Sequence, residues 1–297
     1  MNSLMKIGLF IPTYNAGEEF SQVLDLINQQ SEQLTDKYII DSSSTDNTVA
    51  IAKDKGFNVD VIKSSEFTHG KVRTDAAKKL AHCDYLIYMT QDVYLQPNAI
   101  NELIYFIQKH ETVGVAYGKQ EVDKKTGNIF EERARQFNYG DQELIKTLDQ
   151  VDEYGVKIYF SSDAFAIYNC QLLAEINFFD ESLMFGEDAY AAAHFIKKGY
   201  GVGYVPSAKV FHTHKFSLKN EYIRYIEIGK FHIQNAWLLK EFGSNESEGI
   251  KMVLNETGFL IKSGKILLIP YAYLRYVAKY LGYRKGMRQA TKELKGE

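Results

Sequence analysis

This chain of 297 residues has few cysteines, prolines or tryptophans: two, four and one. Cys83 and Cys170 lie far apart and match no metal-binding or disulfide spacing, so we expect two free thiols in a reducing compartment. No apolar run reaches the roughly 18 residues of a transmembrane helix. Pro12 interrupts the amino-terminal region before the apolar core of a signal peptide can develop. We therefore expect a cytoplasmic protein.

The overall composition is ordinary, but the charge is unevenly distributed. Hydrophobic residues at 45% and charged residues at 25% are typical of a globular chain with a sizeable core. Residues 262–297 contain nine Lys or Arg and two Glu, a net charge of +7, so the rest must carry −10 to give −3 for the whole chain. A basic, aromatic tail on an acidic body indicates an anionic surface as partner, and we expect no nucleic acid.

Short apolar runs alternate with helical patterns through the first half. Strands are predicted at 6–12, 38–41, 59–63 and 85–89, and helices at 17–34, 48–55, 72–82 and 97–109, the last opening on Pro97. This alternation predicts an α/β fold with a mixed, mostly parallel sheet flanked by helices.

The pattern changes after residue 113. Strands are predicted at 113–118, 158–169, 200–206 and 208–214, and a helix at 187–199 that stops at Gly199. From about Glu221 the pattern is helical to the end. We therefore divide the chain into an α/β domain, 1–217, and a basic, aromatic helical extension, 218–297.

The four early strands all run into polar segments. These are "PTYNAG" (12–17), "DSSSTDNT" (41–48), "FTHGKVR" (67–73) and "TQDV" (90–93). Open parallel sheets bind ligands at this edge. Both common phosphate loops, G-x-x-x-x-G-K-[ST] and G-x-G-x-x-G, are missing, so a phosphate would need a metal and side-chain cations. Asp92 offers a metal ligand; the cations would come from His69, Lys71 and Arg73, with Gly70 permitting close backbone approach.

Six motifs in order carry a resemblance over about residues 5–217: "IPTYNAG", "DSSSTDNT", "FTHGKVR", "TQDV", "FGEDAY" and "HTHKFS". Together they resemble the inverting family 2 glycosyltransferases, which have the GT-A (Rossmann-like nucleotide-diphospho-sugar transferase) fold. The forms of the third, fourth and sixth motifs are most similar to bacterial rhamnosyltransferases that use dTDP-L-rhamnose.

The resemblance implies a nucleotide site at the sheet edge. Its residues would be Pro12, Thr13, Tyr14 and Asn15 at the base and ribose, Asp41 at the pyrimidine with Ser43 close by, Lys71 and Arg73 near the base and diphosphate, and Gln91 at a ribose hydroxyl. The alternative for Asp46 is that it caps the helix that follows it. The alternative for Lys71 and Arg73 is that they lie in a solvated loop and do not contact the nucleotide.

Asp92 would take the place of the metal-binding acid of the family's Asp-x-Asp motif. The sequence departs from that motif, because Gln91 replaces the first acid and Val93 follows. The resemblance implies a divalent cation, Mg²⁺ or Mn²⁺, since both bind carboxylate and diphosphate oxygens. His212 and His214 are further candidate ligands, with His212 the first choice and a core histidine the alternative for either.

Two adjacent acids, Glu187 and Asp188, begin the helix at 187–199. The resemblance implies a general base here, and we assign it to Asp188, with Glu187 raising the pKa of Asp188 or orienting the acceptor. The alternative is helix capping favoured by the dipole. Asp163 interrupts a strand-like run, and it would contact either the acceptor sugar or the base-carrying helix.

These expectations amount to an inverting transfer of L-rhamnose from dTDP-β-L-rhamnose to a sugar hydroxyl of a lipid-linked cell-surface polysaccharide precursor. One alternative is a family 2 transferase using UDP-GlcNAc or UDP-galactose. Another is a non-catalytic nucleotide-sugar-binding or scaffolding protein, against which intact Asp92, Asp188, His212 and His214 argue.

The basic tail has two alternative partners. Residues 259–285 interleave Leu, Ile and Tyr with Lys and Arg, and Pro270 predicts two short helices. Amphipathic basic helices with aromatic borders lie in membrane interfaces. We expect either peripheral contact with the inner face of the bacterial membrane, or packing on the rest of the chain or on a second copy in a homodimer.

Overall fold

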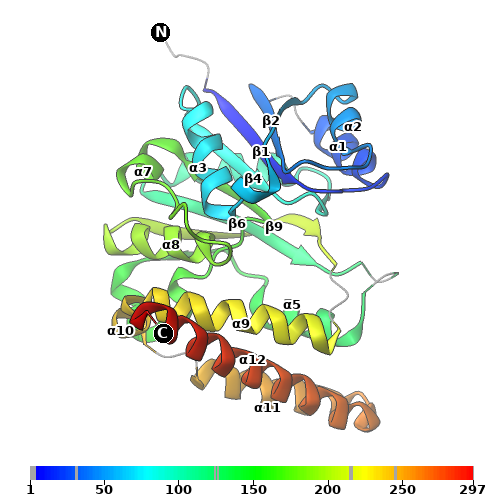
Figure 1. Ribbon diagram of the computed structural model, residues 1–297, viewed down its shortest axis with the longest axis vertical. Helices are drawn as coiled ribbons and strands as arrows, with labels where there is room; N and C mark the ends of the chain where they lie inside the picture. Colours follow the sequence, from blue (N-terminus) through cyan, green and yellow to red (C-terminus); the bar gives the residue numbers. More distant parts are fainter. Residues whose placement is uncertain are drawn as a thin grey trace. The chain divides into compact units, whose positions relative to one another are not determined.

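The structure, a computed structural model, describes residues 5–30, 33–123, 125, 127–213, 217–243 and 246–296. The chain forms two compact units (Figure 1). The first comprises Met1–Asp123, Tyr139–Gln150 and Ile158–Thr213, and the second comprises Lys124–Asn138, Val151–Lys157 and His214–Glu297. The division expected between residues 217 and 218 stays a prediction.

One mixed sheet runs through the first unit, in the order β3-β2-β1-β4-β8-β6-β9-β5, with β7 also paired to β9. The strands are β1 (Ile7–Thr13), β2 (Asp36–Asp41), β3 (Asn58–Val61), β4 (Tyr85–Met89), β5 (Tyr94–Leu95), β6 (Val113–Glu121), β7 (Leu144–Lys146), β8 (Phe165–Asn169) and β9 (Gly201–Phe211). β1 to β4 are mutually parallel, while β8 is antiparallel to both β4 and β6. The predicted mixed sheet flanked by helices is confirmed, with β5 and β7 also antiparallel to β9.

Apolar faces of the helices pack on this sheet. The helices of the first unit are α1 (Phe20–Asn28), α2 (Thr48–Asp54), α3 (His69–Lys79), α4 (Ala99–Lys109), α7 (Cys170–Glu175) and α8 (Glu187–Lys197). All seven residues of β1 are buried, as expected for a central strand covered on both faces. Phe20, Leu24 and Ile27 of α1 join the buried cluster that includes Leu9 and Ile11 of β1. Because β1 is central, its polar carboxyl end is held at a rigid edge.

Several predicted boundaries are wrong. Residues 155–159 form the 3₁₀ helix η3 (Gly155–Tyr159), so only Phe165–Asn169 of the predicted strand 158–169 is extended. The two runs predicted at 200–206 and 208–214 form one strand, β9, whose pairing with β6 shifts register between Gly118 and Lys119. Helix α4 begins after Asn98, which has a left-handed φ of 65°, so Pro97 precedes the helix.

The second unit is helical. It contains α5 (Ile129–Asn138), α6 (Val151–Tyr154), α9 (Leu218–Gln234), α10 (Ala236–Phe242), α11 (Glu246–Lys262), the 3₁₀ helix η4 (Ile266–Leu268) and α12 (Ile269–Lys295). The break expected at Pro270 occurs earlier, around Gly264, and Pro270 lies in the first turn of α12, where its missing N–H costs nothing. No helix in the described ranges is both long and apolar enough to cross a bilayer.

Candidate active site

The carboxyl end of β2 is tied to that of β1 by Asp41. Its buried carboxylate accepts hydrogen bonds from the Thr13 hydroxyl at 2.8 Å, from the Ser44 backbone N–H at 2.8 Å and from the Ser44 hydroxyl at 2.6 Å. A carboxylate with three donors needs no metal to be stable in the interior. Asp41 therefore shapes the loop in which a pyrimidine contact was expected, and that contact stays a prediction.

The loops after β1 and β2 interlock through side-chain to backbone hydrogen bonds. Asn15 donates its backbone N–H to the Ser44 hydroxyl and accepts from the Thr45 N–H, both at 2.8 Å. Asn15 and Ser43 have left-handed φ angles of 44° and 63°, and the Ser43 hydroxyl donates to the Ile62 carbonyl. Asp46 accepts from the Thr48 N–H at the start of α2, consistent with the capping alternative. Pro12 lies buried at the end of β1.

Gln91 contacts the backbone of Tyr14, and its expected role at a ribose hydroxyl stays a prediction. Its side-chain oxygen accepts the Tyr14 N–H at 2.8 Å, and its amide nitrogen donates to the Tyr14 carbonyl at 3.1 Å. This two-point contact fixes the loop after β4 against the loop after β1. Tyr14, by contrast, leaves about half of its side chain exposed and able to stack on a flat ligand.

Asp92 and His212 are brought together by strand pairing. Antiparallel pairing of β5 with β9 places Tyr94 opposite Phe211, so the residues just before Tyr94 meet those just after Phe211. The His212 Nε2 lies 3.4 Å from Asp92 Oδ1. The buried His212 ring is oriented by Gln120 of β6, whose Oε1 lies 2.9 Å from Nδ1.

This arrangement fits a divalent cation. Oriented imidazole and exposed carboxylate are both ligands of Mn²⁺, and a hydrogen bond to the far imidazole nitrogen is the usual way to aim a ligating histidine. Asp92 and His212 would hold the ion. His214, the second candidate histidine, lies outside the described residues.

Another group of ligand-type side chains lies at the other edge of the sheet. Asp36, His82 and Cys83 have ligand atoms within 4.8 Å of one another, at the amino ends of β2 and β4. There the His82 Nε2 already pairs with Asp36 Oδ2 at 2.8 Å, and burial raises the pKa of the Cys83 thiol to about 11. This group is distant in the fold from the polar strand ends and plays no part in the site.

Helix α8 begins with the acid pair. Gly186, with a φ of 80°, turns the chain into the helix. Asp188 is half-buried, and its carboxylate accepts the Ala189 N–H at 2.7 Å and the Asp163 N–H at 3.4 Å. Burial, then the charge of Glu187, raises the pKa of Asp188 to about 6, although Arg73 opposes the shift. A carboxylate with this pKa is largely ionised at neutral pH and more basic than an ordinary aspartate.

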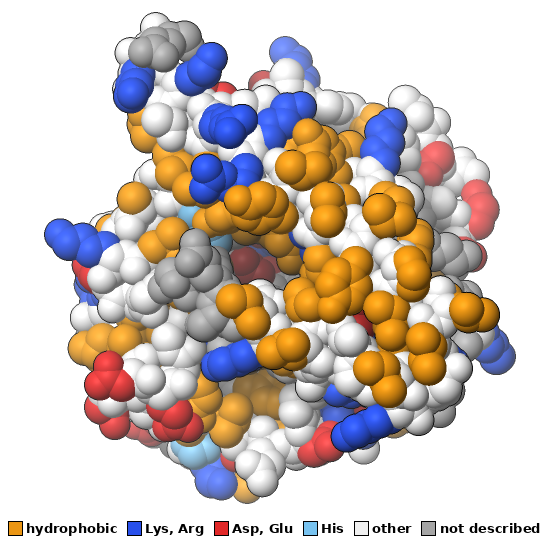
Figure 2. Space-filling model, turned by 90° about the horizontal axis from the view of Figure 1, so that it is seen from below, with side chains coloured by type: hydrophobic (Ala, Val, Ile, Leu, Met, Phe, Trp, Pro, Cys, Tyr) orange, Lys and Arg blue, Asp and Glu red, His pale blue; other side chains and the backbone are white. Residues whose placement is uncertain are grey.

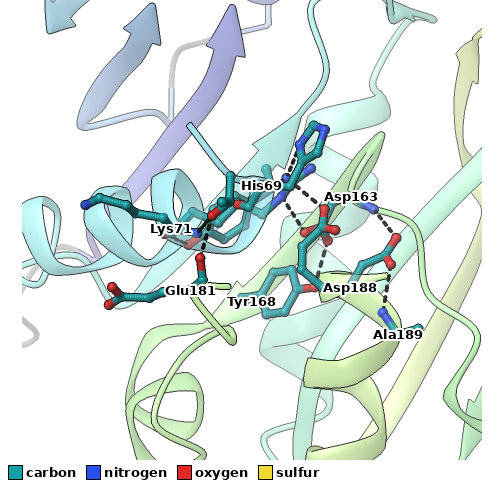
Figure 3. A network of polar contacts seen from close by, with 11 residues as sticks. His69, Lys71, Asp163, Tyr168, Glu181, Asp188 and Ala189 are labelled. Atoms are coloured by element: carbon teal, nitrogen blue, oxygen red, sulfur yellow. Dashed lines mark hydrogen bonds and ion pairs between the residues drawn. The ribbon is translucent and has the colours of Figure 1, made fainter. Parts of the chain in front are cut away.

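Arg73 has buried ion pairs where the sequence predicted contact with the base and diphosphate. Its Nε lies 2.8 Å from Asp163 Oδ2 and its Nη1 lies 2.8 Å from Glu187 Oε1, with all three side chains nearly inaccessible. Figure 3 shows Asp163 of this group together with Tyr168 and Asp188. The solvated-loop alternative is also wrong, because Arg73 lies in α3. Burial lowers the pKa of Arg73, but the charges of Glu187 and Asp163 outweigh it and raise the pKa above its ordinary value.

Glu187 and Asp163 are therefore anchored differently from Asp188. Glu187 is held by Arg73, and both Glu187 and Asp188 lie in the first turn of α8, where the helix dipole also favours negative charge. Asp163 also accepts the Tyr168 hydroxyl at 2.7 Å, while its backbone N–H contacts Asp188. Burial raises the pKa of Asp163 to about 7, against the opposing charge of Arg73. These contacts favour the alternative in which Asp163 supports the base-carrying helix.

His69 is a neutral hydrogen-bonding group. Arg73 Nη1 lies 2.9 Å from His69 Nδ1, and because a guanidinium only donates, Nδ1 must accept. Burial, together with the charge of Arg73, lowers the pKa of His69 to about 3. The ring thus carries its proton on Nε2 and supplies no cation, contrary to the expectation from sequence.

Gly70 and Lys71 also differ from expectation. A Cβ at Gly70 would lie 1.9 Å from the Asp180 carbonyl oxygen, and the Gly70 N–H donates to the Leu183 carbonyl. The close approach therefore serves the chain that leads into α8. Lys71 lies on helix α3 and pairs with Asp75 at 2.7 Å, so its loop alternative is wrong and its contact with a diphosphate stays a prediction.

Sequence reasoning missed Gln120 and Tyr168. Each lies within an ordinary strand pattern, and each acts by orienting another side chain. Nothing in a single sequence marks such residues, because their partners, His212 and Asp163, are 92 and 5 positions away.

Comparisons with known proteins give the family. Residues 9–176 match the sequence profile of glycosyl transferase family 2. Two curated relatives are the O-antigen chain rhamnosyltransferases RfbN of Salmonella typhimurium and WbaN of Salmonella anatum. The first is 37% identical over 95% of this chain and 90% of its own length. The second is 35% identical over 94% of this chain and 88% of its own length.

Solved structures share the fold at low sequence identity. The mannosyltransferase PcManGT from Pyrobaculum calidifontis, in complex with GDP-Man and Mn²⁺, has a TM-score of 0.63 at 13% identity, covering 98% of this chain and 87% of its own. S. aureus TarS 1-349 has a TM-score of 0.56 at 17% identity, covering 99% and 92%. The fold is GT-A, and the chain belongs to glycosyltransferase family 2.

Proposed function

We propose that this glycosyltransferase moves L-rhamnose from dTDP-β-L-rhamnose to a sugar hydroxyl of a cell-surface polysaccharide precursor. The choice of sugar is supported by the two rhamnosyltransferase relatives, each aligned over more than nine-tenths of this chain. The observation that supports the mechanism is that the two adjacent acids, Glu187 and Asp188, have different partners. Glu187 pairs with a buried guanidinium, while the hydrogen bonds that Asp188 accepts within the described part of the chain come from backbone N–H groups, and its pKa is raised.

Asp188 is the proposed general base. Its carboxylate removes the proton from the acceptor hydroxyl as that oxygen attacks the anomeric carbon of the donor. The new carbon–oxygen bond forms as the bond to the β-phosphate oxygen breaks, and the electron pair leaves with dTDP. A single displacement inverts the configuration, so a β-linked donor gives an α-rhamnoside. No enzyme nucleophile is required.

The departing diphosphate needs positive charge. When bound to Asp92 and His212, a divalent cation, Mg²⁺ or Mn²⁺, would neutralise charge on the leaving group. Gln120 holds His212 in the orientation this requires. Gln91 fixes the neighbouring loop but contributes no charge, so Asp92 is the sole carboxylate of the "TQDV" segment.

The nucleotide would lie along the carboxyl ends of β1, β2 and β4. Tyr14 is the exposed aromatic surface there, and Asp41 and Asn15 set the loop shape around it. For the acceptor we propose a lipid-linked saccharide, with the protein at the inner face of the membrane.

A panel of donors tests the proposal. The protein is incubated with Mg²⁺ or Mn²⁺, an acceptor saccharide and, in turn, dTDP-rhamnose, UDP-GlcNAc, UDP-galactose or GDP-mannose, and nucleoside diphosphate release is measured. We expect dTDP-rhamnose to lead, and chelation to abolish release. Turnover with a UDP-sugar alone would replace the donor assignment. Donor binding without any transfer would favour the non-catalytic reading.

A further inference from the structure

Helix α12 exposes an apolar stripe along its first half. Tyr273, Leu274, Val277, Tyr280 and Leu281 are each 47–62% exposed. With about 3.6 residues per turn, these five positions fall on one side of the helix. Large apolar side chains scattered singly are normal on a surface, but a contiguous stripe indicates an interaction site.

The opposite side of α12 is buried and charged. Arg275 donates through Nε to Glu221 Oε2 of α9 at 3.0 Å, and its Nη2 also pairs with Glu221. The Lys279 ammonium lies 3.5 Å from Glu221 Oε1. A helix in water usually buries its apolar side chains and exposes its charged ones. Here α12 buries Arg275 and Lys279 against α9 and exposes Leu and Tyr. The apolar side therefore has a purpose other than packing within this chain.

Glycines prevent α12 from rotating to hide that side. A Cβ at Gly286 would lie 2.0 Å from the Ile226 carbonyl oxygen of α9, and one at Gly282 would lie 2.4 Å from that of Tyr222. Only residues without a side chain allow the two backbones to approach this closely. A side chain at either glycine position would clash with α9, so the packing requires this face of α12 and leaves the stripe exposed.

Basic residues extend the same surface. Arg284, Lys285 and Arg288 are exposed and continue the stripe along α12. Before α12, η4 presents Ile266 and Leu267, 58% and 95% exposed. Figure 2 shows the molecule of Figure 1 from below. Hydrophobic side chains gather on this face, and Lys and Arg side chains lie around the border of the hydrophobic area.

Further exposed side chains belong to the same helices. The apolar ones are Ile250, Leu254 and Ile261 of α11, and the basic ones are Lys262, Lys265, Lys292 and Lys295. We call α11, η4 and α12, with these exposed residues, the C-terminal docking face.

We propose that the C-terminal docking face binds an anionic lipid bilayer, with Leu267 and the α12 stripe entering the interface and the basic residues contacting lipid headgroups. Amphipathic basic helices with Tyr and Leu bind membranes in this way. A second copy fits less well, because a symmetric dimer through this face would bring two sets of like charges together. The proposal rests on surface chemistry alone and does not depend on the sugar transferred.

Vesicle flotation tests the proposal with the full chain. Wild-type protein is mixed with phosphatidylcholine vesicles or with mixed phosphatidylcholine–phosphatidylglycerol vesicles, and the bound fraction is measured. We expect binding to the mixed vesicles, weakened about tenfold or more by the triple variant Leu267→Ser, Leu274→Ser, Tyr280→Ser. Each of Arg284→Gln, Lys285→Gln and Arg288→Gln should weaken it by about fivefold.

A matched control substitutes exposed apolar residues of the first unit. Tyr105→Ser and Leu148→Ser, at 66% and 48% exposure, should leave vesicle binding unchanged. Nucleoside diphosphate release without vesicles confirms that each variant is folded and active. Equal binding of wild type to both vesicle types would overturn the proposal. So would a dimer in sedimentation velocity that binds no vesicles and dissociates in the triple variant, since the face would then serve a second copy.

Discussion

Neighbouring acids in this site have different chemistry because their partners differ. Glu187 and Asp163 share the Arg73 guanidinium, each through an oxygen 2.8 Å from one of its nitrogens. Asp188 lacks an ion pair with Arg73 among the contacts found in the described residues, where its carboxylate accepts the backbone N–H groups of Asp163 and Ala189. Two of these three carboxylates thus pair with one arginine, and the third, Asp188, is the proposed base.

Replacing the base should stop transfer but not donor binding. Asp188→Asn keeps the side-chain size and removes the basic oxygen, so we expect kcat to fall by about 10²–10⁴-fold. Donor affinity, measured by titration with dTDP-rhamnose, should change little. The matched control is Glu181→Gln, a nearby exposed carboxylate paired with Lys78, which should retain activity. Full activity in Asp188→Asn would remove the base assignment.

The pH profile should report the same group. Because the pKa of Asp188 is raised to about 6, the base form is lost as pH falls through that value. We expect kcat/KM to fall tenfold per pH unit well below about 6 and to level off above about 7. Circular dichroism over the same range separates this from acid unfolding. A rate that stays constant down to pH 4.5 would contradict the assignment.

Arg73 should act as a positioning residue. Its charge lowers the pKa of Asp188, so Arg73→Gln should move the acidic limb of the pH profile to higher pH. The same variant leaves buried acids without a cation, which should cost about 3–5 kcal/mol of unfolding free energy. Arg73→Lys keeps the charge and should move the acidic limb of the pH profile part of the way back to its wild-type position. An unshifted limb in a folded Arg73→Gln protein would refute this role.

Helix α3 links the nucleotide edge of the sheet to the acid pair. Its first turn carries His69 and Gly70, and the chain before α8 packs directly on it: Thr68 donates to the Glu181 carbonyl at 2.5 Å, and Gly70 to that of Leu183. The "FTHGKVR" segment is therefore a structural support for the base as much as a candidate ligand contact.

A methyl group at Gly70 should disturb this support. Gly70→Ala places a Cβ 1.9 Å from the Asp180 carbonyl oxygen, and backbone cannot yield as a flexible side chain can. We expect a loss of about 1–3 kcal/mol in unfolding free energy, with reduced kcat. Thermal unfolding measures the first. Gly140→Ala, where no atom lies within 4 Å of the added Cβ, is the control and should be near neutral.

For helices and strands, sequence patterns predict the regular elements well and the irregular ones poorly. The short apolar run of β1 and the apolar spacing of α1 follow from local chemistry. The merging of two runs into β9 depends on its pairing with β6, a partner more than 80 positions away. The polar strand ends predict the site edge, but whether Arg73 faces a ligand or the acids depends on Asp163 and Glu187, which only the tertiary fold brings near.

Over the whole molecule, charge is divided by region. Residues 262–297 carry +7 and the remainder −10. Within the basic region, Arg275 and Lys279 are buried and paired with Glu221, so the other seven cations are the exposed ones.

Vesicle binding and sugar transfer should therefore respond differently to salt. Raising ionic strength shortens the Debye length below about 8 Å, so vesicle binding should weaken steeply with salt. Transfer to a water-soluble acceptor saccharide should change much less over the same range. Both are measured in the same buffers, by flotation and by nucleoside diphosphate release. Vesicle binding that is insensitive to salt would mean that lipid charge contributes little.

The fixed orientation of α12 also bears on how the protein behaves in storage. Since glycine contacts with α9 hold the apolar stripe outward, the chain cannot reduce its apolar surface by a small rotation of the helix. Mutual repulsion of the seven exposed cations then opposes contact between the apolar stripes of two molecules. Polyvalent anions such as phosphate, by neutralising these cations, should lower solubility more than chloride at equal ionic strength.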